Sequence, residues 1–218
     1  MNIEKILTDE FKNKIKEAVN KAEKQSGGEI VTYITENSDK YHFIYWAAGF
    51  FSAFLGYSIF TILYIFSYFV YSHTLFFLGI LFIFPLIVIG LFYLIKPMRL
   101  LLIDKDQKDY YVNLKAKETF LEQEVFNTKD RTGVLIYISL FEKKVVVIGD
   151  TIINQKVNKD EWDTVIQTII DGIKKKSLIN GIVSGILLCG AILKENNVKR
   201  RIRDKNELSD NIKIGRKK

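Results

Sequence analysis

Three carboxylates border predicted strands and can meet at one end of a sheet. Glu29 opens the first predicted strand, Asp130 lies just before the second, and Asp150 follows the third. A crossover connection makes the first two strands parallel, and a tight turn makes the third antiparallel to the second. All three carboxylates are therefore expected at the same end of the sheet.

This acidic end has three interpretations. Carboxylate oxygens are the ligands that Ca²⁺ and Mg²⁺ prefer, so Glu29, Asp130 and Asp150 could hold a divalent cation, with Asn154 or backbone carbonyls completing the shell. A bound metal could in turn support hydrolysis of a phosphate ester. Arg131 could instead neutralise the carboxylates and leave a purely structural group of ion pairs.

Other catalytic patterns are missing from the sequence. It contains no G-x-x-x-x-G-K-[ST] phosphate loop, no H-E-x-x-H zinc motif and no pair of cysteines. The single cysteine, Cys189, lies in an apolar segment, where burial makes a thiol inert. His42 precedes the long apolar stretch, His73 lies in the polar interruption between its two halves, and neither has a catalytic partner in sequence. We therefore expect no catalytic residues and no certain cofactor.

An apolar stretch from Phe43 to Ile95 organises the chain, because it contains no Lys, Arg, Asp or Glu. A bilayer core about 30 Å thick needs roughly 20 helical residues to cross it, so the stretch predicts two transmembrane spans. These spans are expected over residues 45–69 and 75–95. The polar residues between them, 71–74, would form the turn.

Charges that flank the spans predict the orientation. Lys40 precedes the apolar stretch, Lys96, Arg99 and Lys105 follow it, and the turn carries no fixed charge. Positive residues stay on the cytoplasmic side, so both termini and the folded domain are expected in the cytoplasm, with a bacterial inner membrane as the host. Residues 1–28 have no apolar segment typical of a secretory signal.

The remaining chain alternates helical and strand patterns. Hydrophobic periodicity, caps and β-branched runs predict helices over 8–25 and 109–126, a helix capped by Asn158, and strands over 29–35, 133–140 and 145–148. The glycine-containing apolar run from Leu178 to Leu193 reaches only about 24 Å as a helix, which favours a buried helix over a third span.

Basic residues gather near the end of the chain, and the formal net charge is +7. Residues 194–218 hold 10 basic and 4 acidic side chains, and the sequence leaves a solvated tail, contact with anionic lipid and contact with nucleic acid open. No nucleic-acid-binding motif accompanies them, so no nucleic acid partner is expected. Lys143 and Lys144, in the turn opposite the acidic end, are predicted to face the lipid headgroups.

Several short motifs occur in one order along the chain. They are Ala22-Glu23, Ser26-Gly27-Gly28-Glu29-Ile30, Ala116 with Phe120, Arg131-Thr132-Gly133-Val134-Leu135-Ile136-Tyr137-Ile138, Ile148-Gly149-Asp150, Trp162, Gly190 with Leu193, and Asn206-Glu207-Leu208-Ser209-Asp210. In these motifs the chain resembles the TPM domain family. The resemblance implies an α/β/α sandwich, divalent-cation binding at acidic loops, accessory roles in membrane complexes and, in some members, weak phosphatase activity.

The combined prediction is an α/β protein. Residues 1–41 and 99–203 would form one TPM-like α/β/α sandwich with a small mixed sheet, interrupted by a transmembrane hairpin at 42–98 and followed by a basic tail at 204–218. The expected function is non-catalytic: a membrane-anchored module that binds a membrane-protein partner. The alternative is a phosphatase that uses Ca²⁺ or Mg²⁺ at the acidic end. The sequence leaves homo-oligomerisation open.

Overall fold

The chain forms two compact units. In a computed structural model, which describes residues 7–66, 74–175, 177–198 and 206–215, one unit comprises residues 1–39 and 109–218, and the other comprises residues 40–108. The long apolar stretch is therefore an insertion that divides one folded unit in sequence. We call the first the folded unit and the second the apolar unit.

A four-stranded mixed sheet lies at the centre of the folded unit. Its strands are β1 (Glu29–Thr35), β2 (Gly133–Ser139), β3 (Lys144–Gly149) and β4 (Lys213–Ile214), in the order β3-β2-β1-β4. β1 and β2 are parallel, and β2 and β3 are antiparallel. The three strands and the pairing predicted from sequence are confirmed.

The fourth strand, β4, lies within the segment that the sequence predicts to be a basic tail. It pairs in parallel with β1, with Tyr33 opposite Lys213. Ile212 is buried just before the strand, and Leu208 packs against the sheet. These two apolar side chains hold the segment on the sheet, whereas residues 199–205 and 216–218 of the same basic region lie outside the described residues.

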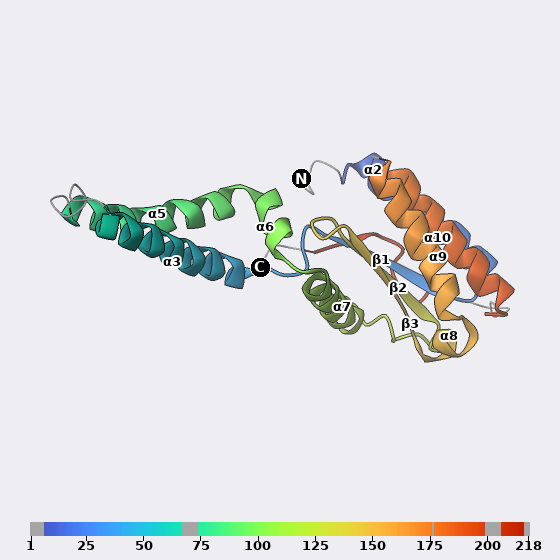
Figure 1. Cartoon of the computed structure of the whole chain (residues 1–218). Coiled ribbons are helices and arrows are strands. Elements are labelled where there is room, and N and C mark those ends of the chain that lie inside the picture. The colour runs from blue at the N-terminus through green and yellow to red at the C-terminus, as the bar shows by residue number, and fades with distance from the viewer. Residues whose placement is uncertain (1–6, 67–73, 176, 199–205, 216–218) are drawn as a thin grey trace. The chain divides into compact units, whose positions relative to one another are not determined.

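Helices cover both faces of the sheet, as Figure 1 shows. The helices α2 (Asp9–Gln25), α9 (Lys159–Lys174) and α10 (Leu178–Glu195) pack on one face, and α7 (Lys105–Glu122) covers the other. A short helix, α8 (Thr151–Lys156), follows β3. The architecture is the predicted α/β/α sandwich, with apolar side chains on alternate strand positions filling two separate cores.

Local sequence signals explain where α2 and α9 begin. The Thr8 hydroxyl accepts a hydrogen bond from the N–H of Phe11 at 3.2 Å, which caps α2 as predicted. At α9, the N–H of Asn158 donates to the Glu161 carboxylate at 2.8 Å, half of a capping box. Both helices bury the predicted apolar stripe against the sheet.

The helix α10 is the apolar run that contains three glycines. Ile182, Ile186, Cys189 and Leu193 are fully buried in the core that it shares with α2, α9 and the sheet. By length and hydropathy α10 could cross a membrane, but this packing makes it the predicted core helix. The close contact between α10 and α9 depends on glycine, because a Cβ atom placed on Gly181 would lie 2.7 Å from the Cα of Gly172 in α9.

The helix α7 differs from its prediction over 109–126. It begins at Lys105 and ends at Glu122, after which Glu124 adopts a left-handed conformation with φ of 51°. The turn redirects the chain, so Val125 is buried as predicted but from a loop position, while Leu121 is exposed. The left-handed residue Glu124 ends the helical path there, although the apolar periodicity continues to Val125.

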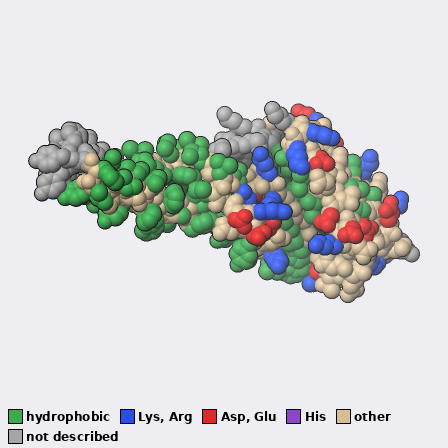
Figure 2. All heavy atoms as spheres, viewed as in Figure 1, with side chains coloured by type: hydrophobic (Ala, Val, Ile, Leu, Met, Phe, Trp, Pro, Cys, Tyr) green, Lys and Arg blue, Asp and Glu red, His purple; other side chains and the backbone are tan. Residues whose placement is uncertain are grey.

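The apolar unit contains a helical hairpin. α3 (His42–Phe66) and α5 (Thr74–Leu94) form the hairpin, and the short helix α6 (Lys96–Leu102) follows it. The predicted turn at 71–74 lies mostly outside the described residues, as does His73. Figure 2 shows hydrophobic side chains over the visible face of this hairpin, and Phe50 and Phe66 are 75% and 83% exposed.

Candidate functional site

The strand register brings the three predicted carboxylates to one end of the sheet. Glu29 in β1 lies opposite Gly133 in β2. The N–H of Asp150 donates to the carbonyl of the same Gly133 at 2.8 Å, at the end of β3. Asp130 lies three residues before Gly133 in the connection from α7. The backbone arrangement predicted for the acidic end is therefore present.

The carboxylates themselves have separate partners. Oδ1 of Asp150 accepts a hydrogen bond from the N–H of Thr151 at 2.7 Å and caps α8. Its Oδ2 accepts no hydrogen bond from the described residues but forms an ion pair with Nε of Arg131 at 2.9 Å. Glu29 accepts from the N–H of Leu208 at 3.2 Å.

These contacts do not fit a metal site. Arg131 takes one oxygen of buried Asp150 and places a positive charge where a cation would bind. Among the residues that the structure describes, no group of three or more His, Cys, Asp or Glu side chains lies as a metal ion requires. Asn154, the predicted additional ligand, donates instead to the carbonyl of Gly149 at 2.6 Å. The ion-pair interpretation of this end agrees with the geometry.

Lys143 and Lys144 lie at the opposite end of the sheet, Lys143 in the turn between β2 and β3 and Lys144 as the first residue of β3. Lys143 is exposed and adopts a left-handed conformation with φ of 54°. Lys144 forms an ion pair with Asp109 at the point where the chain returns from the apolar unit. Only Lys143 of the predicted lipid-facing pair is fully turned to solvent.

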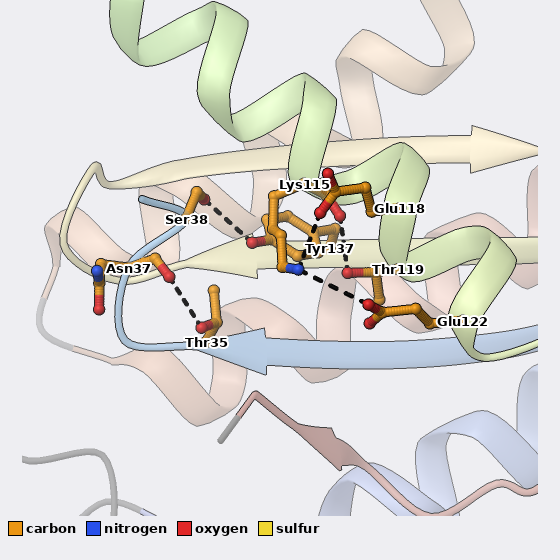
Figure 3. A network of polar contacts seen from close by, with 8 residues as sticks. All are labelled: Thr35, Asn37, Ser38, Lys115, Glu118, Thr119, Glu122 and Tyr137. Carbon is orange, nitrogen blue, oxygen red and sulfur yellow. Dashed lines mark hydrogen bonds and ion pairs between the residues drawn. The ribbon is translucent and has the colours of Figure 1, made fainter. Parts of the chain in front are cut away.

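A polar network surrounds the point where the chain leaves β1 for the apolar unit (Figure 3). The N–H of Ser38 donates to buried Glu142 at 2.9 Å, and its hydroxyl shares a hydrogen bond with the Tyr137 phenol at 3.0 Å. Glu142 also accepts from the hydroxyl of Ser139. We call Ser38, Tyr137, Ser139 and Glu142 the junction network. It fastens the exit of β1 to the turn between β2 and β3.

Tyr33 extends the junction network beneath α7 through its contact with Tyr137. The rings of Tyr33 and Tyr137 stack with centroids 5.6 Å apart. Burial raises the pKa of both phenols, and the hydrogen bond to Ser38 offsets part of the effect at Tyr137. The hydrogen bond to Glu118 raises the pKa of Lys115, which lies near Tyr33. Phenols kept neutral in this way are structural groups and poor nucleophiles.

The buried phenol predicts a specific response to alkaline pH. Above about pH 10 tyrosine ionises in the unfolded chain, while Tyr137 keeps its proton in the folded unit. The unfolded state then binds fewer protons. The contribution of Tyr137 to the free energy of unfolding is therefore constant below this pH and falls above it. We expect Tyr137→Phe to cost about 1 kcal/mol at neutral pH through the lost hydrogen bond, and to flatten the alkaline decline measured by urea unfolding. Tyr110→Phe, at an exposed position on α7, is the control; a decline as steep in Tyr137→Phe as in Tyr110→Phe would contradict this assignment.

The junction network was not predicted from sequence. From sequence, Tyr33 and Tyr137 are residues of predicted strands, and Glu142 lies in the short connection between two of them. Aligning the predicted parallel strands would have placed Tyr33 opposite Tyr137, as the register shows. No local signal indicates that the Glu142 carboxylate turns back into the protein, because this depends on the path of residues 36–38.

The remaining candidates offer no catalytic chemistry. Burial raises the pKa of the Cys189 thiol to about 12, which leaves it protonated and inert as predicted. The ring of His42 lies 6.2 Å from that of Tyr45 in the apolar unit. A surface hollow of about 530 Å³ is lined by polar side chains of α2 and contains none of the predicted site residues.

Comparisons with known proteins agree with this fold. The family model of the TPM domain matches residues 97–192, which run from α6 to α10. Among solved structures, the chain resembles the BA42 protein of the psychrophilic bacterium Bizionia argentinensis, determined by NMR. The TM-score is 0.61 and the identity 24%, over 98% of this chain and 99% of that one. A search of curated proteins found no match. Residues 97–192 thus belong to the TPM domain family, and the fold around them is the α/β/α sandwich that the motifs predicted.

Proposed function

We propose that this protein is a membrane-anchored TPM-domain module that binds a membrane-protein partner and has no catalytic role of its own. The observation that carries the proposal is the exposed apolar surface of the hairpin. α3 has 25 residues, which reach roughly 38 Å at about 1.5 Å per residue, and α5 has 21. Neither contains a charged residue. Such a surface is stable only against lipid or protein.

The membrane assignment rests on α3 and α5 together. By length and hydropathy, α3 could span a bilayer, while the described apolar part of α5, Leu81–Leu94, is shorter. The hydroxyls of Ser58 and Thr61 donate to backbone carbonyls one turn earlier in α3, which satisfies these groups without water. The rings of Tyr45 and Tyr93, whose centroids are 6.1 Å apart, would form the aromatic belt at the cytoplasmic side.

Membrane extraction and protease protection test the anchor and its orientation. We expect the full chain to sediment with membranes, to resist extraction at alkaline pH and to require detergent for release. In intact spheroplasts an external protease should leave the folded unit uncut, because both junctions would lie in the cytoplasm. A chain that stays in the supernatant refutes the anchor, and cleavage beyond Lys194 refutes the orientation.

The partner is tested by crosslinking in native membranes. A photoreactive residue at exposed Lys143 should capture a membrane protein or anionic lipid if the turn faces the bilayer. The matched position is exposed Lys159 on α9. Equal crosslinking patterns at both positions would count against a partner surface near the turn.

The phosphatase alternative makes the opposite prediction at the acidic end. Its metal ligands would be Glu29, Asp130 and Asp150. Since Arg131 already pairs with Asp150, we expect millimolar Ca²⁺ or Mg²⁺ to leave the melting temperature of the solubilised chain unchanged. Hydrolysis of a chromogenic phosphate ester should be equal in the wild type and in a Glu29→Gln, Asp130→Asn, Asp150→Asn variant. A metal-dependent rise in melting temperature together with loss of hydrolysis in the variant would establish the enzyme.

A further inference from the structure

The helix α6 is a separate element between the hairpin and the folded unit, and its surface is unusual. The backbone of Ile95, with φ of −100° and ψ of 84°, interrupts the helix between α5 and α6, and Pro97 follows at the start of α6. Figure 1 shows α6 turning away from the axis of α5. The chain therefore changes direction directly after its last apolar span.

The end of α6 carries exposed apolar residues. Leu101 and Leu102 are 86% and 51% exposed, although they are among the most apolar residues in the chain. Leu94, the last residue of α5, and Ile95, which precedes α6, are also exposed. Exposed apolar residues therefore lie on either side of the break between α5 and α6 and again at the end of α6.

Arg99 fixes α6 to the hairpin. Its guanidinium donates to the Tyr45 hydroxyl of α3 at 2.8 Å and lies 5.7 Å from the centre of that ring. Tyr45 in turn lies beside Tyr93 of α5. Because tyrosines at span ends occupy the headgroup level of a bilayer, this contact sets the depth of α6.

A third contact closes the end of α6. The ammonium of Lys108 donates to the carbonyl of Leu100 at 2.9 Å, and the N–H of Ile103 donates to the carbonyl of Arg99 at 3.2 Å. Exposed Lys105 opens α7 three residues later, between exposed Asp104 and Asp106. A short helix with exposed leucines, held by an arginine and bonded to a lysine of the next helix, combines the apolar and basic residues of a helix that lies in a membrane interface.

We propose that α6 lies in the plane of the bilayer, at the boundary between headgroups and acyl chains, with Leu101 and Leu102 among the acyl chains. The occupant of its exposed leucines is the phospholipid that surrounds the hairpin, because exposed apolar residues also stand at the end of α5 and the Arg99 contact holds α6 at the aromatic belt. The inference rests on the proposed membrane anchor. It adds that the return to the folded unit is held in the interface and is not a free tether.

Lipid quenching of a fluorescent label tests the depth of α6. The full chain is reconstituted in phosphatidylcholine vesicles with an environment-sensitive label at Leu101→Cys, while buried Cys189 stays unreactive. Phe54→Cys at the middle of α3 and Lys159→Cys on α9 are the matched controls. Brominated lipids with the bromine near the headgroup should quench the Leu101 label most, those brominated deep in the chain should quench the Phe54 label most, and neither should quench the Lys159 label.

The outcomes separate this inference from the anchor proposal. A Leu101 label that behaves like the Lys159 label, while the Phe54 label is quenched, overturns the interfacial helix and leaves the anchor intact. A Leu101 label shielded from lipid only at high protein density overturns it in favour of contact between copies. An unquenched Phe54 label overturns the anchor and the inference together.

A conservative variant tests the role of Arg99 as a positioning residue. Tyr45→Phe removes the hydroxyl that accepts from Arg99 but keeps the ring. We expect shallow quenching of the Leu101 label to decrease, with the Phe54 label unchanged. Unchanged quenching at Leu101 would show that this hydrogen bond does not set the depth of α6.

Discussion

Gly133→Ala is expected to destabilise the folded unit by about 3 kcal/mol, at the upper end of what overpacking costs. A Cβ atom at this position would lie 1.9 Å from the carbonyl oxygen of Val125 and 3.0 Å from its carbon. Both are backbone atoms, so no side chain can rotate to make room. The loop between α7 and β2 must move, and with it the register of the central strand.

Urea unfolding of the solubilised full chain measures this effect. The chain has two tryptophans, Trp46 in the apolar unit and Trp162 buried in α9. In a Trp46→Phe background, Trp162 fluorescence therefore reports on the folded unit alone. Gly28→Ala is the control, because within 3 Å its Cβ would meet only Cδ1 of Leu193, the far end of a flexible side chain. Losses of equal size in the two variants would contradict the backbone explanation.

Gly172→Ala should also weaken the folded unit, by about 2 kcal/mol, through the contact between α9 and α10. The new Cβ would lie 2.3 Å from the Cα of Gly181 and 2.9 Å from its nitrogen. Alanine in a helix is intrinsically favoured over glycine by about 1 kcal/mol. A measured loss would therefore run against helix propensity and could come only from the helix contact.

Two glycines in other surroundings control for that propensity. At Gly185 a Cβ would meet only side-chain atoms of Ile169 within 3 Å, so Gly185→Ala should cost much less. At Gly90, in α5, an added Cβ would meet no atom within 4 Å. Gly90→Ala should therefore leave the unfolding of the folded unit, followed by Trp162 fluorescence, unchanged. The same unfolding measurement applies. A stabilised Gly172→Ala variant would show that α9 and α10 can separate freely.

The parts of the fold that sequence could predict are those with a strong local signal. The apolar stripe of α2, from Phe11 to Ala22, repeats at three and four residues and is buried as expected. The unbroken apolar run predicted over 133–140 forms β2, which lies inside the sheet and is buried at every position. In each case the hydrophobic pattern of the sequence agrees with the burial in the structure over several residues.

The elements that the sequence did not reveal are short and depend on distant contacts. β4 has only two residues and forms by pairing with the edge of β1. α6 has only seven residues, too few to show a hydrophobic period. Likewise, the chain order placed Glu29 and Asp150 at one end, but only the side-chain geometry shows Arg131 on Asp150.

The turn between β2 and β3 receives both connections to the apolar unit. Ser38 is bonded to Glu142 where the chain departs, and Asp109 pairs with Lys144 where it returns. For the sheet, the whole apolar unit is therefore equivalent to a single surface loop, whose length adds little entropy cost once its ends are joined. Such an architecture is modular: the hairpin could be exchanged for a different insertion, or for a few linker residues, without altering any strand pairing.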